Sequence, residues 1–194
     1  MNIANKLTLA RIMMIPVFIL LLSLSLDWGQ VTWLGAVIPV HQLLAGVVFE
    51  VASFTDYLDG YLARKYNLVT SFGAFADPMA DKLLVMAAFI MLVAYNVVPA
   101  WIVIIIISRE LLVTGLRVLL AQYDGKVMAA AMPGKIKTFS QMFSIVFYLF
   151  NDAGFVMLNI PIADILLYIC LFFTVYSGVD YFYQARFVFI DNVK

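Results

Sequence analysis

Charged residues are scarce in this chain: Asp, Glu, Lys and Arg make up 12% of its 194 residues, while 65% are hydrophobic. Soluble domains usually carry about 25% charged residues, so the composition excludes an ordinary soluble fold and indicates a membrane protein. Cysteine is almost lacking too. The single Cys170 excludes an internal disulfide and is interpreted as a small packing residue. The first apolar run lacks a small-residue cleavage pattern, so no signal peptide is expected.

Long apolar runs are abundant, and the chain has room for six membrane-spanning helices of about 20 residues each. The expected spans are 11–26, 43–64, 77–95, 99–120, 136–150 and 162–183, and an amphipathic segment at 3–9 precedes the first of them. The breaks between spans contain Gly, Pro, Asn or Asp, which favour turns. The prediction is an all-α polytopic membrane protein, with six transmembrane helices and an N-terminal juxtamembrane amphipathic helix, forming a single domain over 1–194.

The positive charges are distributed unevenly along the chain. With the N-terminus in the cytoplasm, every Lys and Arg falls at a cytoplasmic helix end, in a cytoplasmic loop or on a helix face opening towards one. The segments 27–41, 96–99 and 151–161 contain none. This asymmetry is typical of the positive-inside rule. We therefore expect a multi-pass protein of the cell membrane with a cytoplasmic N-terminus, surrounded by membrane lipids and without a nucleic-acid partner.

Four aspartates lie close together in the sequence. Asp56 and Asp59 are three residues apart, and Asp77 and Asp81 are four apart, so each pair shares one face of a helix. Carboxylates at membrane depth are costly and persist mainly where they pair, bind ions or line a watered cavity. Hard oxygen ligands select Mg²⁺, Mn²⁺ or Ca²⁺, and four of them can hold two divalent cations. Asp77 also fits an N-cap before Pro78, which would explain that residue alone.

Small and basic residues accompany the aspartates. Gly60 lets a ligand approach the helix backbone, and Ala63 keeps the same face small one turn later. Arg64 suits bidentate pairing with a phosphate, and Gly73 allows a turn or a second close approach. Paired metals stabilise charge on attacking and leaving oxygens in phosphoryl displacement. The predicted ligand is rich in phosphate, such as a diphosphate nucleotide, and the site opens to the cytoplasm.

Together these residues form the pattern D-x2-D-G-x2-A-R-x8-G-x3-D-x3-D over 56–81, which matches the signature of the CDP-alcohol phosphotransferases without a gap. That family transfers a phosphatidyl or related group from a CDP-linked donor to an alcohol and releases CMP. The resemblance implies two Mg²⁺ or Mn²⁺ ions, a base that deprotonates the acceptor, and a homodimer. The implied metal ligands are Asp56, Asp59, Asp77 and Asp81, with Asp81 also as the base. The residues implied to hold the cytidine diphosphate are Asp59, Gly60, Ala63, Arg64 and Gly73.

A second group of candidate residues is basic. Arg109 and Arg117 are eight residues apart, about two helical turns, and Lys135 and Lys137 open the next expected helix. Four cations suggest a pocket for a second anion, separate from the metals. Two other interpretations stay open: the lysines anchor the cytoplasmic side, or Arg109 pairs with an acid. Its candidate partners are Glu50 and Glu110, the latter weakened because adjacent helix positions point about 100° apart.

Three further segments are similar to one branch of the family, the bacterial phosphatidylglycerophosphate synthases. They are NKLTLAR at 5–11, SRELLVTGLR at 108–117 and GKIKT at 134–138. The resemblance implies CDP-diacylglycerol as the donor and sn-glycerol 3-phosphate as the acceptor. The residues implied to hold the acceptor phosphate are Arg109, Arg117, Lys135 and Lys137. Those implied to help hold the donor nucleotide are Asn5, Thr8 and Arg11.

Two alternatives remain at this point. The same family could act on inositol phosphate, serine or phosphatidylglycerol, and the basic set disfavours a neutral acceptor without separating glycerol phosphate from inositol phosphate. From a different class, the carboxylates could form a cation or proton pathway in a transporter. That interpretation is disfavoured because the acids cluster near one face and alternate with glycine and arginine suited to phosphate. A purely structural subunit leaves the four acids unexplained.

Overall fold

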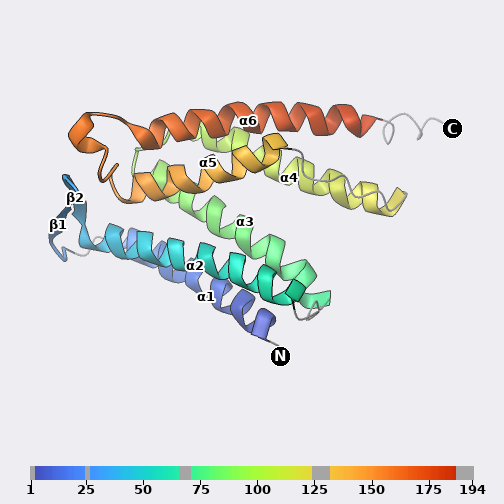
Figure 1. Ribbon diagram of the computed structural model, residues 1–194, viewed down its shortest axis with the longest axis horizontal. Helices are drawn as coiled ribbons and strands as arrows, with labels where there is room; N and C mark the ends of the chain where they lie inside the picture. Colours follow the sequence, from blue (N-terminus) through green and yellow to red (C-terminus); the bar gives the residue numbers. More distant parts are fainter. Residues whose placement is uncertain (1–2, 25–26, 66–70, 124–131, 187–194) are drawn as a thin grey trace.

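The computed structural model describes residues 3–24, 27–65, 71–123 and 132–186, and the side chains of residues 6–24, 27–55, 79–120 and 132–186. Within these ranges the chain forms six long α-helices, one β-hairpin and a short 3-10 helix (Figure 1). The helices are α1 (Ile3–Ser23), α2 (Val40–Lys65), α3 (Ser71–Ala94), α4 (Ala100–Tyr123), α5 (Met132–Leu149) and α6 (Ile162–Gln184). The hairpin strands are β1 (Gln30–Trp33) and β2 (Ala36–Pro39), and η1 spans Val156–Leu158.

The helices form two groups with α3 between them. On one side α1 packs on α2, and on the other α5 and α4 pack on α6, while α3 contacts helices of both groups (Figure 1). The start of α1 and the end of α6 lie at the same end of the bundle, and the hairpin and the 150–161 connection lie at the opposite end (Figure 1). The described connections at the hairpin end contain no Lys or Arg. The two ends of the bundle therefore differ in charge.

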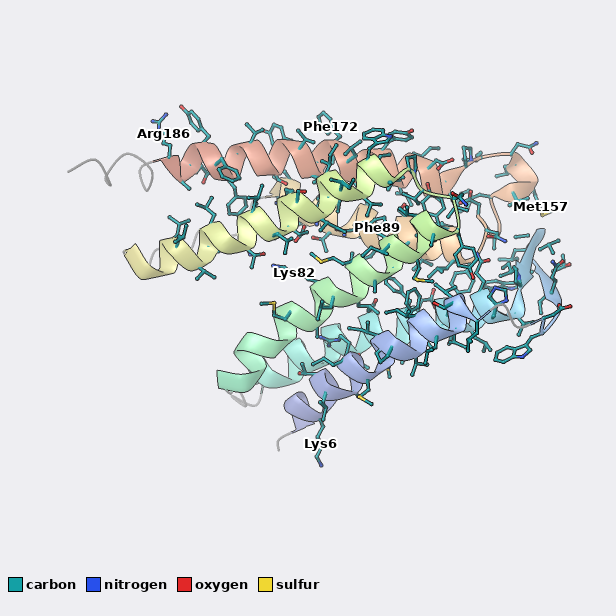
Figure 2. All side chains as sticks on the ribbon, turned by 180° about the vertical axis from the view of Figure 1, so that it is seen from behind. Lys6, Lys82, Phe89, Met157, Phe172 and Arg186 are labelled. Carbon is teal, nitrogen blue, oxygen red and sulfur yellow. The ribbon has the colours of Figure 1, made fainter. Side chains whose placement is uncertain are left out.

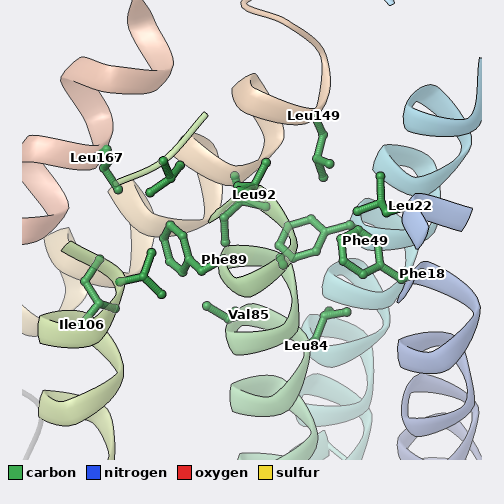
Figure 3. Close-up of a cluster of buried hydrophobic side chains, with 14 of the residues drawn as sticks. Phe18, Leu22, Phe49, Leu84, Val85, Phe89, Leu92, Ile106, Leu149 and Leu167 are labelled. Carbon is green, nitrogen blue, oxygen red and sulfur yellow. The ribbon is translucent and has the colours of Figure 1, made fainter. Parts of the chain in front are cut away.

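The core follows from this central position of α3. Leu84 of α3 faces Phe18 of α1 and Phe49 of α2 on one side, whereas Phe89 faces the helices of the other group (Figure 3). The Phe18 and Phe49 ring centroids are 6.0 Å apart, and both side chains are fully buried. Since α3 is buried on both sides, its apolar residues do not follow one narrow stripe.

Large apolar side chains also cover the outside of the bundle. Phe172 on α6 is 64% exposed and points away from the other helices (Figure 2). Such a surface suits hydrocarbon better than water. By length and composition, two helices of the described chain qualify as candidate membrane spans, Lys6–Ser23 and Ile162–Gln184, and Val40–Thr55 is a shorter apolar helix. The mostly helical, apolar architecture agrees with the predicted class, while the number of spanning helices stays a prediction.

Two predicted helix starts are wrong. The amphipathic segment at 3–9 is not a separate helix but the first part of α1, which continues to Ser23 with Pro16 inside it. No glycine or proline interrupts the chain between Ile3 and Pro16, so the helical backbone hydrogen bonds continue from this segment into the rest of α1. The third helix begins at Ser71, before the predicted 77. Asp77 therefore lies inside α3, and its interpretation as an N-cap is wrong.

The hairpin was not predicted from the sequence, which indicated only a break there. Its antiparallel strands pair Val31 with Ile38 and are joined at Leu34 and Gly35, whose φ angles are 47° and 83°. Two positive φ angles are typical of tight hairpin turns, but Leu is an unusual residue at the first position. Contacts with the α5–α6 connection hold the hairpin: Asn151 Nδ2 donates to the Val37 carbonyl at 2.8 Å, and Gly154 N to the Leu34 carbonyl at 3.0 Å.

Gly46 of α2 packs closely against Phe150 at this end of the fold. A Cβ atom added there would lie 2.8 Å from Cζ of Phe150, a buried ring that itself packs edge-on against Trp33. We expect Gly46→Ala to destabilise the protein by about 1–3 kcal/mol, because the ring and its neighbours must shift. The thermal midpoint in detergent measures this change.

Gly115→Ala in α4 is the matched control for Gly46→Ala, because a Cβ there meets nothing within 4 Å. Replacing a helical glycine by alanine in open space stabilises by up to about 1 kcal/mol. The two variants should thus shift the midpoint in opposite directions. A Gly46→Ala variant as stable as the control would show that the Phe150 contact yields easily.

Candidate active site

A cavity of about 60 Å³ lies between α3, α4 and α5. On α3 the lining residues Asp81, Val85 and Phe89 are spaced four apart and share one helix face. Lys82 projects from the same helix towards α4 (Figure 2). The polar residues of the lining are Asp81, Lys82, Glu110, Lys137, Thr138 and Gln141. Asp81, the last aspartate of the motif, thus lines the same cavity as Lys137, which the sequence places in the separate basic group.

Glu110 of α4 is the centre of an ion network beside this cavity. Its Oε1 accepts hydrogen bonds from Lys137 Nζ and from Arg109 Nη1, the latter at 3.2 Å. The side chains of Lys137, Glu110 and Arg109 are 4%, 15% and 13% exposed. Because little water reaches these side chains, each charge is stabilised mainly by its ion-pair partner.

A second contact, from an ammonium group to a hydroxyl, lies next to the ion network. Lys82 Nζ donates to Thr114 Oγ1, and Thr114 Oγ1 donates to the backbone carbonyl of Glu110 at 2.6 Å. The hydroxyl therefore ties Lys82 to the same turn of α4 that carries Glu110. This contact keeps a second ammonium group at the cavity.

The sequence argument against Glu110 as the partner of Arg109 is wrong. Although adjacent residues leave a helix about 100° apart, both side chains are long enough to bend towards each other. The other proposed partner, Glu50, instead lines an outer groove with Trp33, Val47 and Phe147. One feature of the sequence indicated a special role for Glu110: it is an acid deep within an apolar helix.

The two arginines of α4 face α6. Arg109 Nη2 donates to Ser177 Oγ at 2.8 Å, and Arg117 Nη2 donates to Tyr181 Oη at 2.5 Å. Their guanidinium carbons lie 5.8 and 5.1 Å from the centroid of the Tyr181 ring, within reach of a cation–π contact. The contacts of Ser177 and Tyr181 with these arginines could not be predicted from the sequence, because only the packing of α4 on α6 brings the residues together.

The four predicted acceptor-binding cations are therefore not gathered around one cavity. Lys137 lines it, Arg109 reaches it through Glu110, and Arg117 lies on the α6 side. Lys135 is exposed. Lys82, which directly follows Asp81, lines the cavity as well, whereas the charge pattern of the sequence predicts only that it lies on the cytoplasmic side. The position of Lys82 next to Asp81 in the sequence is the feature that could have predicted its place at the cavity.

On the other side of the bundle, α1 packs against α2 just before the aspartate motif. Thr8 and Arg11 are completely buried. Arg11 Nε donates to the carbonyl of Ala52 at 3.2 Å, and Thr55 Oγ1 donates to the same carbonyl at 2.7 Å. Ala52 lies one turn before Asp56, so the predicted donor-binding residues of α1 lie beside the start of the motif.

Most of the motif itself is described only as backbone. Asp56, Asp59, Gly60, Ala63 and Arg64 lie in the last part of α2, and Gly73 and Asp77 in the first part of α3, but their side chains, like that of Asn5, lie outside those described. The backbone keeps each aspartate pair on one helix face, and α2 contacts α3. Asp81, whose side chain is described, is partly buried at the cavity.

The donor chemistry of the motif fits hard divalent cations, because its ligands are all carboxylate oxygens on two contacting helices. Among the side chains that the structure describes, no group of three or more His, Cys, Asp or Glu is placed to hold a metal ion. That search excludes Asp56, Asp59 and Asp77. The metal site thus remains a prediction from the motif.

The helical bundle and its apolar outer surface indicate a membrane-associated protein, and two acids and two lysines line its cavity between α3, α4 and α5. The chain matches the CDP-alcohol phosphatidyltransferase family over residues 1–176. It is 50% identical to the CDP-diacylglycerol–glycerol-3-phosphate 3-phosphatidyltransferase of Bacillus subtilis over 181 residues, 93% of each chain. The chain therefore belongs to the CDP-alcohol phosphatidyltransferase family, and the family prediction is confirmed.

Two further relatives have the same kind of name. The protein of that name from Rickettsia typhi is 40% identical over 97% of this chain and 99% of its own. A probable phosphatidylglycerophosphate synthase of Mycobacterium tuberculosis H37Rv is 39% identical over 95% of this chain and 81% of its own. The similarity thus extends over nearly the whole chain and not only over the motif.

Proposed function

We propose that this protein transfers the phosphatidyl group of CDP-diacylglycerol to sn-glycerol 3-phosphate, giving phosphatidylglycerol phosphate and CMP. The names of relatives that are 39–50% identical support this reaction. The structural observation that carries the proposal is the shared cavity of Asp81 and Lys137. A carboxylate able to take a proton and a cation able to hold a phosphate face the same space, as an anionic alcohol requires.

In the proposed reaction, Lys137 and Lys82 hold the acceptor phosphate, and a carboxylate oxygen of Asp81 takes the proton from the acceptor hydroxyl. The resulting alkoxide attacks the β-phosphorus of the donor. A new P–O bond to glycerol phosphate forms as the bond to the CMP oxygen breaks, and CMP leaves with that electron pair. The phosphatidyl group is thereby transferred without a covalent enzyme intermediate.

The donor end of the site is assigned to the motif and to α1. Arg64 would pair with a donor phosphate, Gly60, Ala63 and Gly73 would leave room for the cytidine diphosphate, and Asn5, Thr8 and Arg11 would flank it. Two Mg²⁺ or Mn²⁺ ions held by Asp56, Asp59, Asp77 and Asp81 would neutralise pyrophosphate charge. Arg11 supports this assignment, because its hydrogen bond to the Ala52 carbonyl places it beside α2 one helical turn before Asp56.

We further propose that all six helices span the cell membrane, with the hairpin end outside and the N-terminus and site in the cytoplasm. The absence of Lys and Arg from the described connections at the hairpin end supports this orientation. The acyl chains of the donor would stay in the bilayer beside the apolar outer surface of the helices. Assembly as a homodimer is proposed from the family resemblance.

The test is CMP release by the purified protein in detergent, with CDP-diacylglycerol, glycerol 3-phosphate and Mg²⁺ or Mn²⁺. We expect release to need both substrates and to stop with a chelator of divalent metals. Serine and inositol phosphate, tested as replacement acceptors, should not support it. Release with another alcohol would keep the family and overturn the acceptor, and no release from folded, metal-loaded protein would contradict the proposed activity.

A further inference from the structure

A buried acid in a pocket for a phosphate needs an explanation, because it repels the ligand. Glu110 is such an acid: it lines the cavity together with Lys82 and Lys137, and its Oε1 accepts from both Lys137 and Arg109. An ion pair of this kind also occupies the donors that a bound phosphate would need.

The ion pair lies in the wall of the cavity itself. Lys137 and Glu110 both line this space, and their contact engages the Lys137 ammonium group there. A phosphate that binds Lys137 in the cavity therefore has to compete with the Glu110 carboxylate for it.

We propose that Glu110 is an internal counter-ion, which pairs with Lys137 while the acceptor site is empty and is exchanged for the acceptor phosphate on binding. The inference rests on the proposed function of this cavity. Lys137 is only 4% exposed and must keep a partner when no phosphate is present. A phosphate dianion replaces the single carboxylate oxygen with several stronger acceptor atoms.

The contacts around Glu110 indicate which groups move. Arg109 is held from a second direction by Ser177 at 2.8 Å, and its stem passes Gly178, where an added Cβ would lie 3.3 Å from Arg109 Cγ. Lys82 is tied to Thr114. Lys137 has a flexible four-carbon stem. Arg109 therefore holds the released Glu110 carboxylate, while Lys137 turns towards the phosphate.

Exchange makes Glu110 a positioning and specificity residue. An anion enters only if it competes with a carboxylate already in place, so a dianion is favoured over a monovalent anion such as chloride. Removing the charge of Glu110 should thus improve anion binding and weaken this discrimination. If Glu110 only stabilised the fold or bound the acceptor hydroxyls, removing its charge would weaken anion binding or leave it unchanged.

The test compares wild-type protein with Glu110→Gln, which keeps the shape of the side chain and removes its charge. We expect the KM for glycerol 3-phosphate and the inhibition constant of inorganic phosphate to fall about tenfold, the factor for about 1.4 kcal/mol. Inhibition by chloride should become stronger. The value of kcat should change less than KM, because Asp81 is unaltered. A KM that rises or stays constant overturns the proposal.

Two additional measurements keep the test decisive. Glu110→Asp pulls the carboxylate back by one methylene and weakens its pair with Lys137, so its KM should lie between those of wild type and Glu110→Gln; an unchanged or higher KM again counts against exchange. Glu50→Gln, the same change in the outer groove of α2, is the matched control and should leave both constants as in wild type.

Phosphate-induced thermal stabilisation in detergent separates this inference from the proposed function, because it needs no turnover. Half-maximal stabilisation should occur at about tenfold lower phosphate concentration in Glu110→Gln than in wild type, by the same free-energy factor. If that shift is seen without CMP release, the exchange holds and the reaction assignment fails. If release is normal and the shift is missing, the reaction holds and the exchange is wrong.

Discussion

Asp81→Asn is expected to lower kcat for CMP release by about 10²–10⁴-fold, the usual range for loss of a general base. Asparagine is nearly isosteric with aspartate but does not take up the proton of the acceptor hydroxyl. Because Asp81 lines the cavity beside Lys82 and Lys137, the substitution changes the proposed proton acceptor without filling the space. The measurement is CMP release at saturating CDP-diacylglycerol and glycerol 3-phosphate.

The Asp81 prediction needs a separate measurement of metal binding, since the same residue is a predicted ligand. Binding of Mn²⁺ to the variant, followed by its paramagnetic signal, distinguishes a lost base from a lost metal. Asp180→Asn is the matched control, because Asp180 accepts a hydrogen bond from Gln184 on α6 at 2.8 Å and does not line the cavity. Near-wild-type turnover of Asp81→Asn with Mn²⁺ bound would show that another group takes the proton.

Lys137→Met is expected to raise the KM for glycerol 3-phosphate by about 30- to 150-fold, since a charge-assisted hydrogen bond to a phosphate contributes about 2–3 kcal/mol. The apolar side chain also leaves Glu110 with Arg109 as its remaining ion-pair partner in the described network. We therefore expect a loss of stability of about 3 kcal/mol, at the low end for breaking a buried pair. Initial rates over a range of acceptor concentrations, together with the thermal midpoint, measure the two effects.

Lys135→Met is the matched control for Lys137→Met. Both lysines lie near the start of α5, but Lys135 is exposed and Lys137 is buried at the cavity. An exposed charge acts through water and typically contributes less than about 1 kcal/mol, so the KM should rise less than about fivefold. Equal effects of the two substitutions would place the acceptor phosphate outside the cavity.

The arrangement of these residues links the packing of the bundle to its proposed chemistry. Because α3 lies between the two groups of helices, Asp81 is carried to the side of α4 and α5, where Glu110 and Lys137 meet it. The same packing turns Arg109 and Arg117 towards Tyr181 of α6. Arg109 therefore supports the network around Glu110 and Arg117 ties α4 to α6, whereas Lys82 and Lys137 face the cavity directly.

Much of the fold could be predicted from local sequence. Apolar runs separated by turn residues correspond to the six long helices of the described chain, because each run is long enough to form a helix and each break disfavours one. The details that failed depend on distant contacts. The hairpin is held by Asn151 and Gly154, far along the chain, and Leu34 lacks the usual signal for its turn.

The sequence by itself determined the family, the helical class and the spacing of the aspartates, because each depends on the identity and order of residues within short segments of the chain. Only the tertiary structure decided which basic residues reach the cavity. Residues two apart on a helix point about 200° apart, so either Lys135 or Lys137 can face inward, but not both. Which of them does so is set by the rotation of α5 against α3 and α4, and that rotation comes from packing between helices.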